Sequence, residues 1–326
     1  YYLVWKLFSI PGVIFLMAFT VVAFYTVLYL DSLRPHRNHL SSLFVLILSV
    51  FIMRERFVER PDTFSFLFSG LTILSIHAYI HDGKRYIYFM PLVALLWANI
   101  HSSIILIIPI YGSFIAGGLL QYLLSKRGYA FLFTPDIKKL KTLTIVFIVS
   151  LFMGLINPNF LKQYIFGSEV MGPFTWYKHE IAELQKPTWA TYKSPFIVTG
   201  ILFLSFLLPF VRSLFKKEKA FNLSISHLFL IIPFVYMAFM AIRFIFPLTV
   251  VASPIIARNL SIFFPSPRVS RTFVMAVAGT FAVYALLVFL GPLDTTFPRK
   301  KIGIGIDYRL IPEGALRYMD KNNIYG

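Results

Sequence analysis

The chain has 326 residues, of which 58% are hydrophobic and only 14% are charged, and its formal net charge is +17. A soluble domain of this length would carry about a quarter charged residues, so the composition excludes an ordinary soluble enzyme and indicates a protein that crosses a membrane several times. Cysteine is absent, which excludes disulfide bonds and thiolate chemistry.

Apolar stretches alternate with polar loops along the whole chain, and we predict a transmembrane helix for each stretch. The ten predicted spans are 7–30, 40–53, 63–80, 86–98, 101–124, 140–156, 195–211, 223–241, 244–263 and 273–291. Two of them, 40–53 and 86–98, are shorter than the roughly 17 residues that a lipid-exposed span needs, so we expect them to be buried in protein or to line a wet cavity. The polar stretch Asn99–Ser103 predicts a turn inside the long run 86–124.

The charges of the loops predict an orientation for this bundle. Sixteen Lys/Arg and four Asp/Glu fall in the loops on one side, whereas the other side and the tail carry fourteen and ten; the first set is 31–39, 81–85, 125–141, 212–222 and 258–272. Excess Lys/Arg in short loops indicates the cytoplasmic side. We therefore assign the net charge to this bias, expect anionic lipid headgroups as the partner of the inner loops, and exclude nucleic acid.

The sequence divides into a transmembrane helical domain, 1–293, and the start of an extracytoplasmic domain, 294–326. The outer loop 157–194 is rich in aromatic residues and is expected to lie partly in the interface. Small residues at helical spacing, Gly112/Ala116 and Ser113/Gly117, predict close helix packing. Because the chain begins within apolar sequence and stops after NNIYG, we expect a part of a longer protein, truncated at both ends.

Charged residues that suit phosphate binding occur in the outer loops. The segment RERFVERPD packs six charges into nine residues, and we expect Arg60, with Arg54 or Arg56, to bind a phosphate through its guanidinium. The alternative is a helix end whose charges pair with one another. Arg243 lies between two apolar runs, where a charge is costly and needs a partner such as a lipid phosphate or Glu183.

Acidic and amide residues in the other outer loops are candidates for catalysis and for lining a pocket. Glu180 and Glu183 are three residues apart and would suit a general base or a divalent cation, the alternative being a solvated amphipathic turn. Asn99 and His101 belong to the turn at 99–103, where they either bind a ligand or satisfy broken backbone hydrogen bonds. Asn157 opens the next outer loop.

Two histidines on the inner side share a helix face. His77 and His81 are four residues apart, a spacing that could supply half of a metal site, but no third ligand is visible nearby. We therefore predict an interfacial position in which their polar tips reach the headgroups, and we assign no metal ligands.

Taken in order, several outer motifs resemble a family of bacterial membrane proteins related to the GT-C glycosyltransferases. They are ERPDTFSFLF (59–68), LLWANIHSS (95–103), GLINPNF (154–160), EIAELQKPTW (180–189), AIRFIFPLTVVASPIIARNL (241–260) and IPEGALRYMDKNNIYG (311–326). The resemblance implies a GT-C-like helix bundle in the bacterial inner membrane, a polyprenyl-phosphate-linked sugar as donor, an extracytoplasmic acceptor site and an outer C-terminal domain.

The chain departs from this family in two places. The acidic motif that the family usually carries in its first outer loop is absent, since nothing acidic precedes Asp31, and the resemblance places that loop upstream of Tyr1. The family's usual Trp after the outer Glu is replaced by Leu184.

The main hypothesis is a membrane glycosyltransferase for a hexose or a pentose. In it Glu183 and Glu180 act as base or cation ligands, Arg60, Arg56 and Arg243 bind the phosphate, and Asn99, His101 and Asn157 line the site. The cofactor stays open, with a divalent cation such as Mg²⁺ or Mn²⁺ as the candidate. The alternatives are a multi-pass transporter or lipid-carrier flippase, which should show polar residues deep in the spans and on both sides, and a non-catalytic assembly subunit.

Overall fold

The computed structural model describes residues 2–34, 37–53, 60–129, 131, 133–165, 181–216, 224–263 and 321, and within these ranges the chain forms helices and no strand. It divides into two compact units, Tyr1–Ala18 with Arg268–Gly326, and Phe19–Pro267. The second unit holds the helix bundle and every site considered below.

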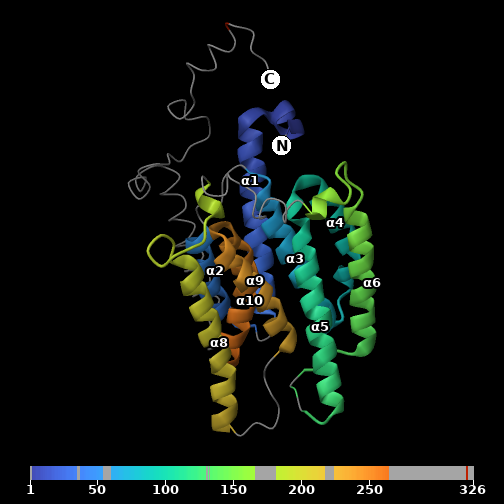
Figure 1. The fold of residues 1–326 in the computed structure, drawn as a ribbon, viewed down its shortest axis with the longest axis vertical. Coiled ribbons are helices and arrows are strands. Elements are labelled where there is room, and N and C mark those ends of the chain that lie inside the picture. The colour runs from blue at the N-terminus through green and yellow to red at the C-terminus, as the bar shows by residue number, and fades with distance from the viewer. Residues whose placement is uncertain are drawn as a thin grey trace. The chain divides into compact units, whose positions relative to one another are not determined.

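The longer helices of the second unit lie roughly parallel or antiparallel to one another in a bundle (Figure 1). They are α1 (Tyr2–Leu33), α2 (His39–Met53), α3 (Asp62–Asp82), η2 (Arg85–Phe89), α4 (Met90–Ile100), η3 (Ser102–Leu106), α5 (Ile107–Lys126), α6 (Ile137–Gly154), η5 (Ala182–Leu184), α8 (Ser194–Lys216), α9 (Ile225–Met240), η6 (Ile242–Phe244) and α10 (Ile245–Phe263). Each predicted span up to 244–263 coincides with a helix, whereas 273–291 and nearly all of the tail 294–326 lie outside the described residues. The predicted turn at 99–103 separates α4 from η3.

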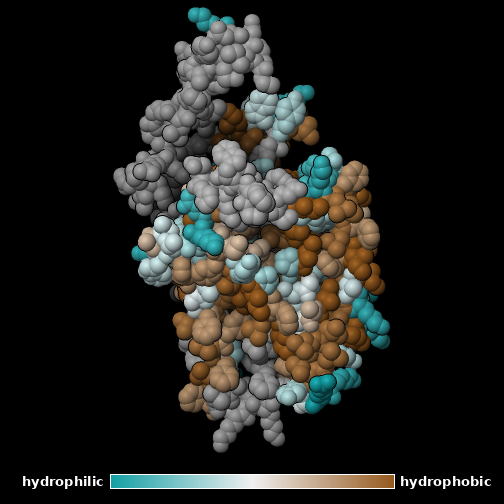
Figure 2. Space-filling view, viewed as in Figure 1, coloured by the Kyte–Doolittle hydropathy of each residue, from teal (hydrophilic) through white to brown (hydrophobic). Residues whose placement is uncertain are grey.

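Among the described residues, five helical segments are long enough and apolar enough to cross a membrane. They lie in α1, α3, η3–α5, α8 and η6–α10, while α2, η2–α4 and α9 are shorter apolar helices. Figure 2 shows hydrophobic side chains over the middle of the bundle and hydrophilic ones nearer its two ends. We call the end where α3 and α10 begin the outer end, following the predicted orientation, and the end where they finish the inner end.

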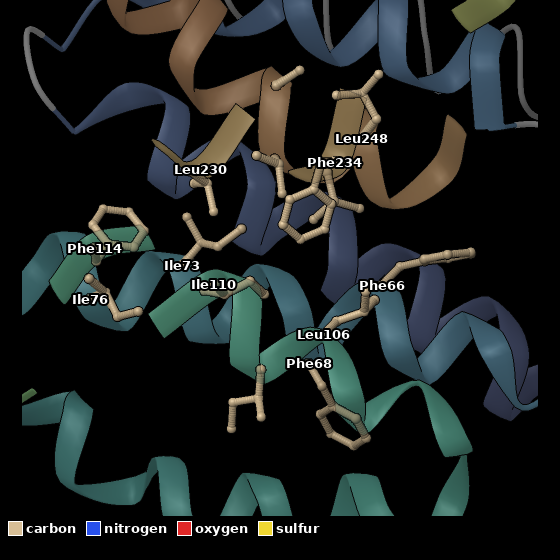
Figure 3. Packing of buried hydrophobic residues seen from close by; sticks show 14 of the residues in the cluster. Phe66, Phe68, Ile73, Ile76, Leu106, Ile110, Phe114, Leu230, Phe234 and Leu248 are labelled. Carbon is tan, nitrogen blue, oxygen red and sulfur yellow. The ribbon is translucent and has the colours of Figure 1, made fainter. Parts of the chain in front are cut away.

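The most buried helices are α10 and α3. In the most apolar 18 residues of each, 89% of the α10 residues and 72% of the α3 residues are buried, against 28% in α8. Figure 3 shows part of the core, in which Phe66 and Ile73 of α3 belong to one buried cluster with Leu248 of α10, Phe114 of α5 and Phe234 of α9. A polar group on α3 or α10 is therefore cut off from water unless it lies near a helix end.

The two short helices, expected to be buried in protein or to line a wet cavity, are each buried on one face. On α2, Val45, Ser49 and Met53 are buried, but Phe44 and Phe51 on the other face are exposed. On α4 the same division holds, with Met90, Ala94 and Trp97 buried and Leu92 and Leu96 exposed. Each short helix therefore packs one stripe against the bundle and presents a second apolar stripe outward.

Close packing of small residues is confirmed between α5 and α9 at one of the two predicted pairs. A Cβ added at Gly117 would lie 2.5 Å from the Cα of Ser226, and Ser113 Oγ donates to the backbone oxygen of Phe229 over 3.1 Å. At Gly112 a Cβ would meet nothing within 4 Å. The backbones of α5 and α9 thus approach each other on the Ser113/Gly117 face only.

Candidate functional site

Segments far apart in sequence meet at the outer end through an ion pair. Arg60, directly before α3, donates from Nη1 to Oε1 of Glu183 in η5 over 3.0 Å. The side chains are 55% and 40% exposed, so both remain accessible to a ligand. Two of the predicted site residues, a cation and a carboxylate 123 positions apart in the sequence, are therefore in direct contact.

A backbone hydrogen bond brings the segment of Arg243 to the same place. The amide of Ile242 donates to the carbonyl oxygen of Gln185 over 2.9 Å, which joins η6 to the residue that follows η5. The amide of Ile242 is free of the α9 helix because Ala241 has an extended backbone (φ −157°), which ends α9 before the short turn η6 begins. Arg243 is half-buried and directly follows Ile242 in the chain. Glu183 lies two residues before Gln185, the other partner of this hydrogen bond.

A second polar group lies beside the first turns of α3. Trp97 Nε1 of α4 donates to Ser65 Oγ over 3.1 Å and to Ser103 Oγ over 3.3 Å, and the two serine hydroxyls are hydrogen-bonded to each other. His101 Nδ1 lies 2.7 Å from Ser103 Oγ and 3.1 Å from Ser65 Oγ. This Trp97 cluster joins α3, α4 and η3.

The hydrogen bonds of His101 fix its tautomer. Its Nδ1 accepts from the backbone amide of Ser103 over 3.2 Å, so the proton of the neutral ring lies on Nε2. Through the same bond His101 caps η3, which satisfies an amide left free at the break between α4 and η3. The described contacts of the Nδ1 atom are therefore those of a structural cap.

The amides of Asn99 and Asn157 satisfy backbone carbonyl groups. Asn99 Nδ2 donates to the oxygens of Leu95 and Ile156, each over 2.8 Å. Asn157 Nδ2 donates to Gly154 O over 2.7 Å, and its Oδ1 accepts from the amide of Asn159. Asn99 thus ties the end of α4 to the turn after α6, and Asn157 holds that turn against the end of α6, so both amides have structural roles.

The turn after α6 is fixed further by a tyrosine and a glycine. Tyr164 donates its hydroxyl to Leu151 O over 3.0 Å, and burial raises the pKa of Tyr164 to about 12, so the phenol stays protonated and keeps donating. A Cβ at Gly154 would lie 2.0 Å from the Tyr164 oxygen. This packing holds the turn that contains Asn157 against the end of α6.

The remaining predicted site residues are not tested by these contacts. Arg54, Arg56 and Glu180 lie outside the described residues. Within the part of the chain that is described, no group of three or more His, Cys, Asp or Glu residues is arranged to hold a metal ion. The carboxylate pair that would bind Mg²⁺ or Mn²⁺ therefore stays a prediction.

The inner end contains a buried ionisable group that sequence reasoning missed. Asp31 of α1, His77 of α3, His227 of α9 and Arg258 of α10 form one hydrogen-bonded chain. The predicted interfacial position of His77 was wrong, because only 7% of it is exposed. Asp31 and Arg258, which we had counted as loop residues, belong to helices α1 and α10. The one signal in the sequence was a polar residue at the inner end of each of four apolar runs.

These features define an all-helical protein with several helices suited to a membrane, an exposed ion pair at one end and a buried ionisable chain at the other. No protein-family model, no curated protein and no solved structure matches the chain.

Proposed function

We propose that the protein is a membrane glycosyltransferase that moves a sugar from a polyprenyl-phosphate donor to a hydroxyl acceptor at the extracytoplasmic side. The observation that carries this proposal is the Arg60–Glu183 pair, which joins a phosphate-binding group to a proton acceptor at an exposed position. The resemblance of the outer motifs to GT-C enzymes supports the same reaction.

In the proposed reaction the bond between the sugar's anomeric carbon and the phosphate oxygen breaks, and a bond to the acceptor oxygen forms. Glu183 takes the acceptor's proton, and Arg60 and Arg243 neutralise the charge that builds on the departing phosphate. A guanidinium has five N–H donors, so Arg60 could hold Glu183 and a phosphate oxygen together. Once the phosphate shares the positive charge of Arg60, the carboxylate of Glu183 becomes a better proton acceptor.

The test is transfer from a radiolabelled polyprenyl-phosphate sugar by the full-length protein in lipid nanodiscs. We expect Glu183→Gln to abolish most transfer while donor binding persists, and Arg60→Ala to weaken donor binding. Lys186→Ala, which removes an exposed charge from the same segment, is the matched control and should leave both unchanged. Full transfer by the Glu183→Gln variant would exclude the base role, and unchanged donor binding by Arg60→Ala would exclude the phosphate role.

A second candidate function, a transporter or lipid-carrier flippase, is favoured by the buried chain at the inner end. Such proteins carry ionisable groups within the spans, and polar residues here occur at both ends of the bundle. The two functions separate in sealed liposomes that contain a fluorescent polyprenyl phosphate. A flippase moves this lipid between leaflets without an acceptor, whereas a transferase changes it only when the acceptor is present.

A further inference from the structure

Four helices meet at the inner end through a chain of three hydrogen-bonded contacts. Asp31 Oδ1 lies 2.8 Å from His77 Nδ1, His77 Nε2 lies 3.0 Å from His227 Nε2, and His227 Nδ1 lies 3.1 Å from Nη1 of Arg258. Asp31, His77 and His227 are 4%, 7% and 3% exposed, so water does not compete for these contacts. The two imidazole rings stand nearly perpendicular, at 81°, which lets their Nε2 atoms face each other.

The two ends of this chain determine where its protons lie. Arg258 can only donate hydrogen bonds, and the ionised carboxylate of Asp31 can only accept them. With both imidazoles neutral, one arrangement satisfies every contact: Arg258 donates to His227 Nδ1, His227 donates from Nε2 to His77 Nε2, and His77 donates from Nδ1 to Asp31. His227 is then the Nε2–H tautomer and His77 the Nδ1–H tautomer.

Protonation of either imidazole disrupts this arrangement at the same contact. If His227 takes the proton, its Nδ1 becomes a donor and faces the donor Nη1 of Arg258. If His77 takes it, His77 donates from Nε2, so His227 must accept there and carry its own proton on Nδ1. In both cases two donors face each other between α9 and α10, and a second positive charge lies beside Arg258.

We propose that Asp31, His77, His227 and Arg258 form a proton-binding site, in which uptake of one proton by the histidine pair breaks the Arg258–His227 contact between α10 and α9. The ligand of this site is a proton, and the structural consequence is the loss of one of the contacts that fix the inner end of α10. The proposal is independent of whether the protein transfers a sugar or moves a lipid.

The charged and titratable groups near the inner end of the pair come from α1, α3 and α6. Arg34 of α1 is bound to Asp82 of α3, and Lys139 of α6 donates to the backbone oxygen of Ile80 over 2.6 Å. His81, one turn after His77, has its ring 6.2 Å from that of His77. From α5 the neighbour is an uncharged ring, Phe114, 5.2 Å from His77. Burial of the pair and the charge of Arg258 disfavour an added proton, whereas the carboxylate of Asp31 favours one.

The nearest titratable neighbour of the pair towards the inner surface is His81. Its ring packs 4.3 Å from that of Phe133, in the segment between α5 and α6.

A metal ion does not fit the same four residues. A metal held by the two Nε2 atoms would require a proton on Nδ1 of each ring, and the His227 Nδ1 proton would face Arg258. The charge of Arg258 would also repel a cation. Within the described residues no third His, Cys, Asp or Glu completes such a site.

The experiment is a pH titration of the full-length protein in nanodiscs, with ¹⁵N-labelled histidine observed by NMR. At high pH we expect an Nδ1–H signal for His77 and an Nε2–H signal for His227, with a coupling across their hydrogen bond. On acidification one proton should enter the pair and the contact with Arg258 should be lost. Assignment uses His77→Gln and His227→Gln.

Two variants test the electrostatics in opposite directions. Asp31→Asn should move the midpoint of proton uptake to lower pH, and Arg258→Gln should move it to higher pH, each by about 1–3 units. Arg85→Gln, which removes an exposed charge in η2, is the control and should leave the midpoint in place. Unchanged tautomers of both rings from about pH 9 to pH 4 would refute the proposal, as would reversed tautomers or shifts of the same sign in the two variants.

Discussion

The two ends of the bundle differ in how they surround their ionisable side chains. At the outer end Arg60 and Glu183 form a pair that is about half exposed, and nearby amides are used on backbone carbonyls. At the inner end Asp31, His77 and His227 are buried and bonded only through one another and Arg258. An exposed pair contributes little to stability, whereas a buried chain becomes costly once a member is removed. The density of charge in a loop therefore does not indicate which ionisable groups contribute most to stability.

The largest stability effect is expected at the inner end. Asp31→Ala removes the carboxylate that balances Arg258 and should lower stability by about 3–5 kcal/mol, because a charge is left uncompensated in the protein interior. Thermal denaturation in detergent measures this as a lower midpoint. Asp82→Ala, which removes an exposed partner of Arg34, is the matched control and should cost less than about 1 kcal/mol. Equal losses in the two variants would contradict the contrast drawn between buried and exposed pairs.

The second-largest loss of stability is expected at the contact that holds α9, which carries His227, against α5. Gly117→Ala places a methyl group 2.5 Å from the backbone of Ser226 and should cost about 1–3 kcal/mol, since backbone cannot move aside as a side chain can. Gly112→Ala meets no atom within 4 Å and should be neutral or stabilise the helix by about 0.5–1 kcal/mol. Opposite signs in a thermal melt support the packing, and a loss at Gly112 alone would contradict it.

A smaller effect is expected from the Trp97 cluster at the outer end. Trp97→Phe keeps an aromatic ring but removes the Nε1 donor to Ser65 and Ser103, which should cost about 0.5–1.5 kcal/mol. The exposed Trp189 gives the comparison, since Trp189→Phe removes no buried hydrogen bond. Both variants are compared by thermal denaturation, and equal midpoints would show that the cluster adds nothing to stability.

The smallest stability effect and the largest functional effect are expected together at Glu183. Glu183→Gln removes one charge of a half-exposed pair and should change stability by less than about 1 kcal/mol. Under the proposed function the same variant loses most of its transfer activity, because an amide cannot accept the acceptor's proton. A variant that is both strongly destabilised and inactive would assign Glu183 a structural role instead.

Local patterns were sufficient for the positions of the helices. The turn between α4 and η3 followed from the polar run Asn99–Ser103, and the close approach of α5 to α9 from Ser113 and Gly117. The alternation of sides predicted that Arg60, Glu183 and the Arg243 segment lie at one end, and the contacts of Arg60 with Glu183 and of Ile242 with Gln185 agree. Length alone did not predict which face of α2 and α4 is buried, because that depends on the helices that pack against each one.

The sequence by itself determined that the chain forms apolar helices of alternating direction, because hydrophobic length and loop charge are local quantities that each segment carries alone. Only the tertiary structure decided which polar residues are buried together. His77 and His227 lie 150 positions apart, and nothing in either segment specifies the other. Their contact depends on how α3, α5 and α9 pack, since the backbone of α9 must approach α5 at Gly117 before His227 can reach His77 and close the chain from Asp31 to Arg258.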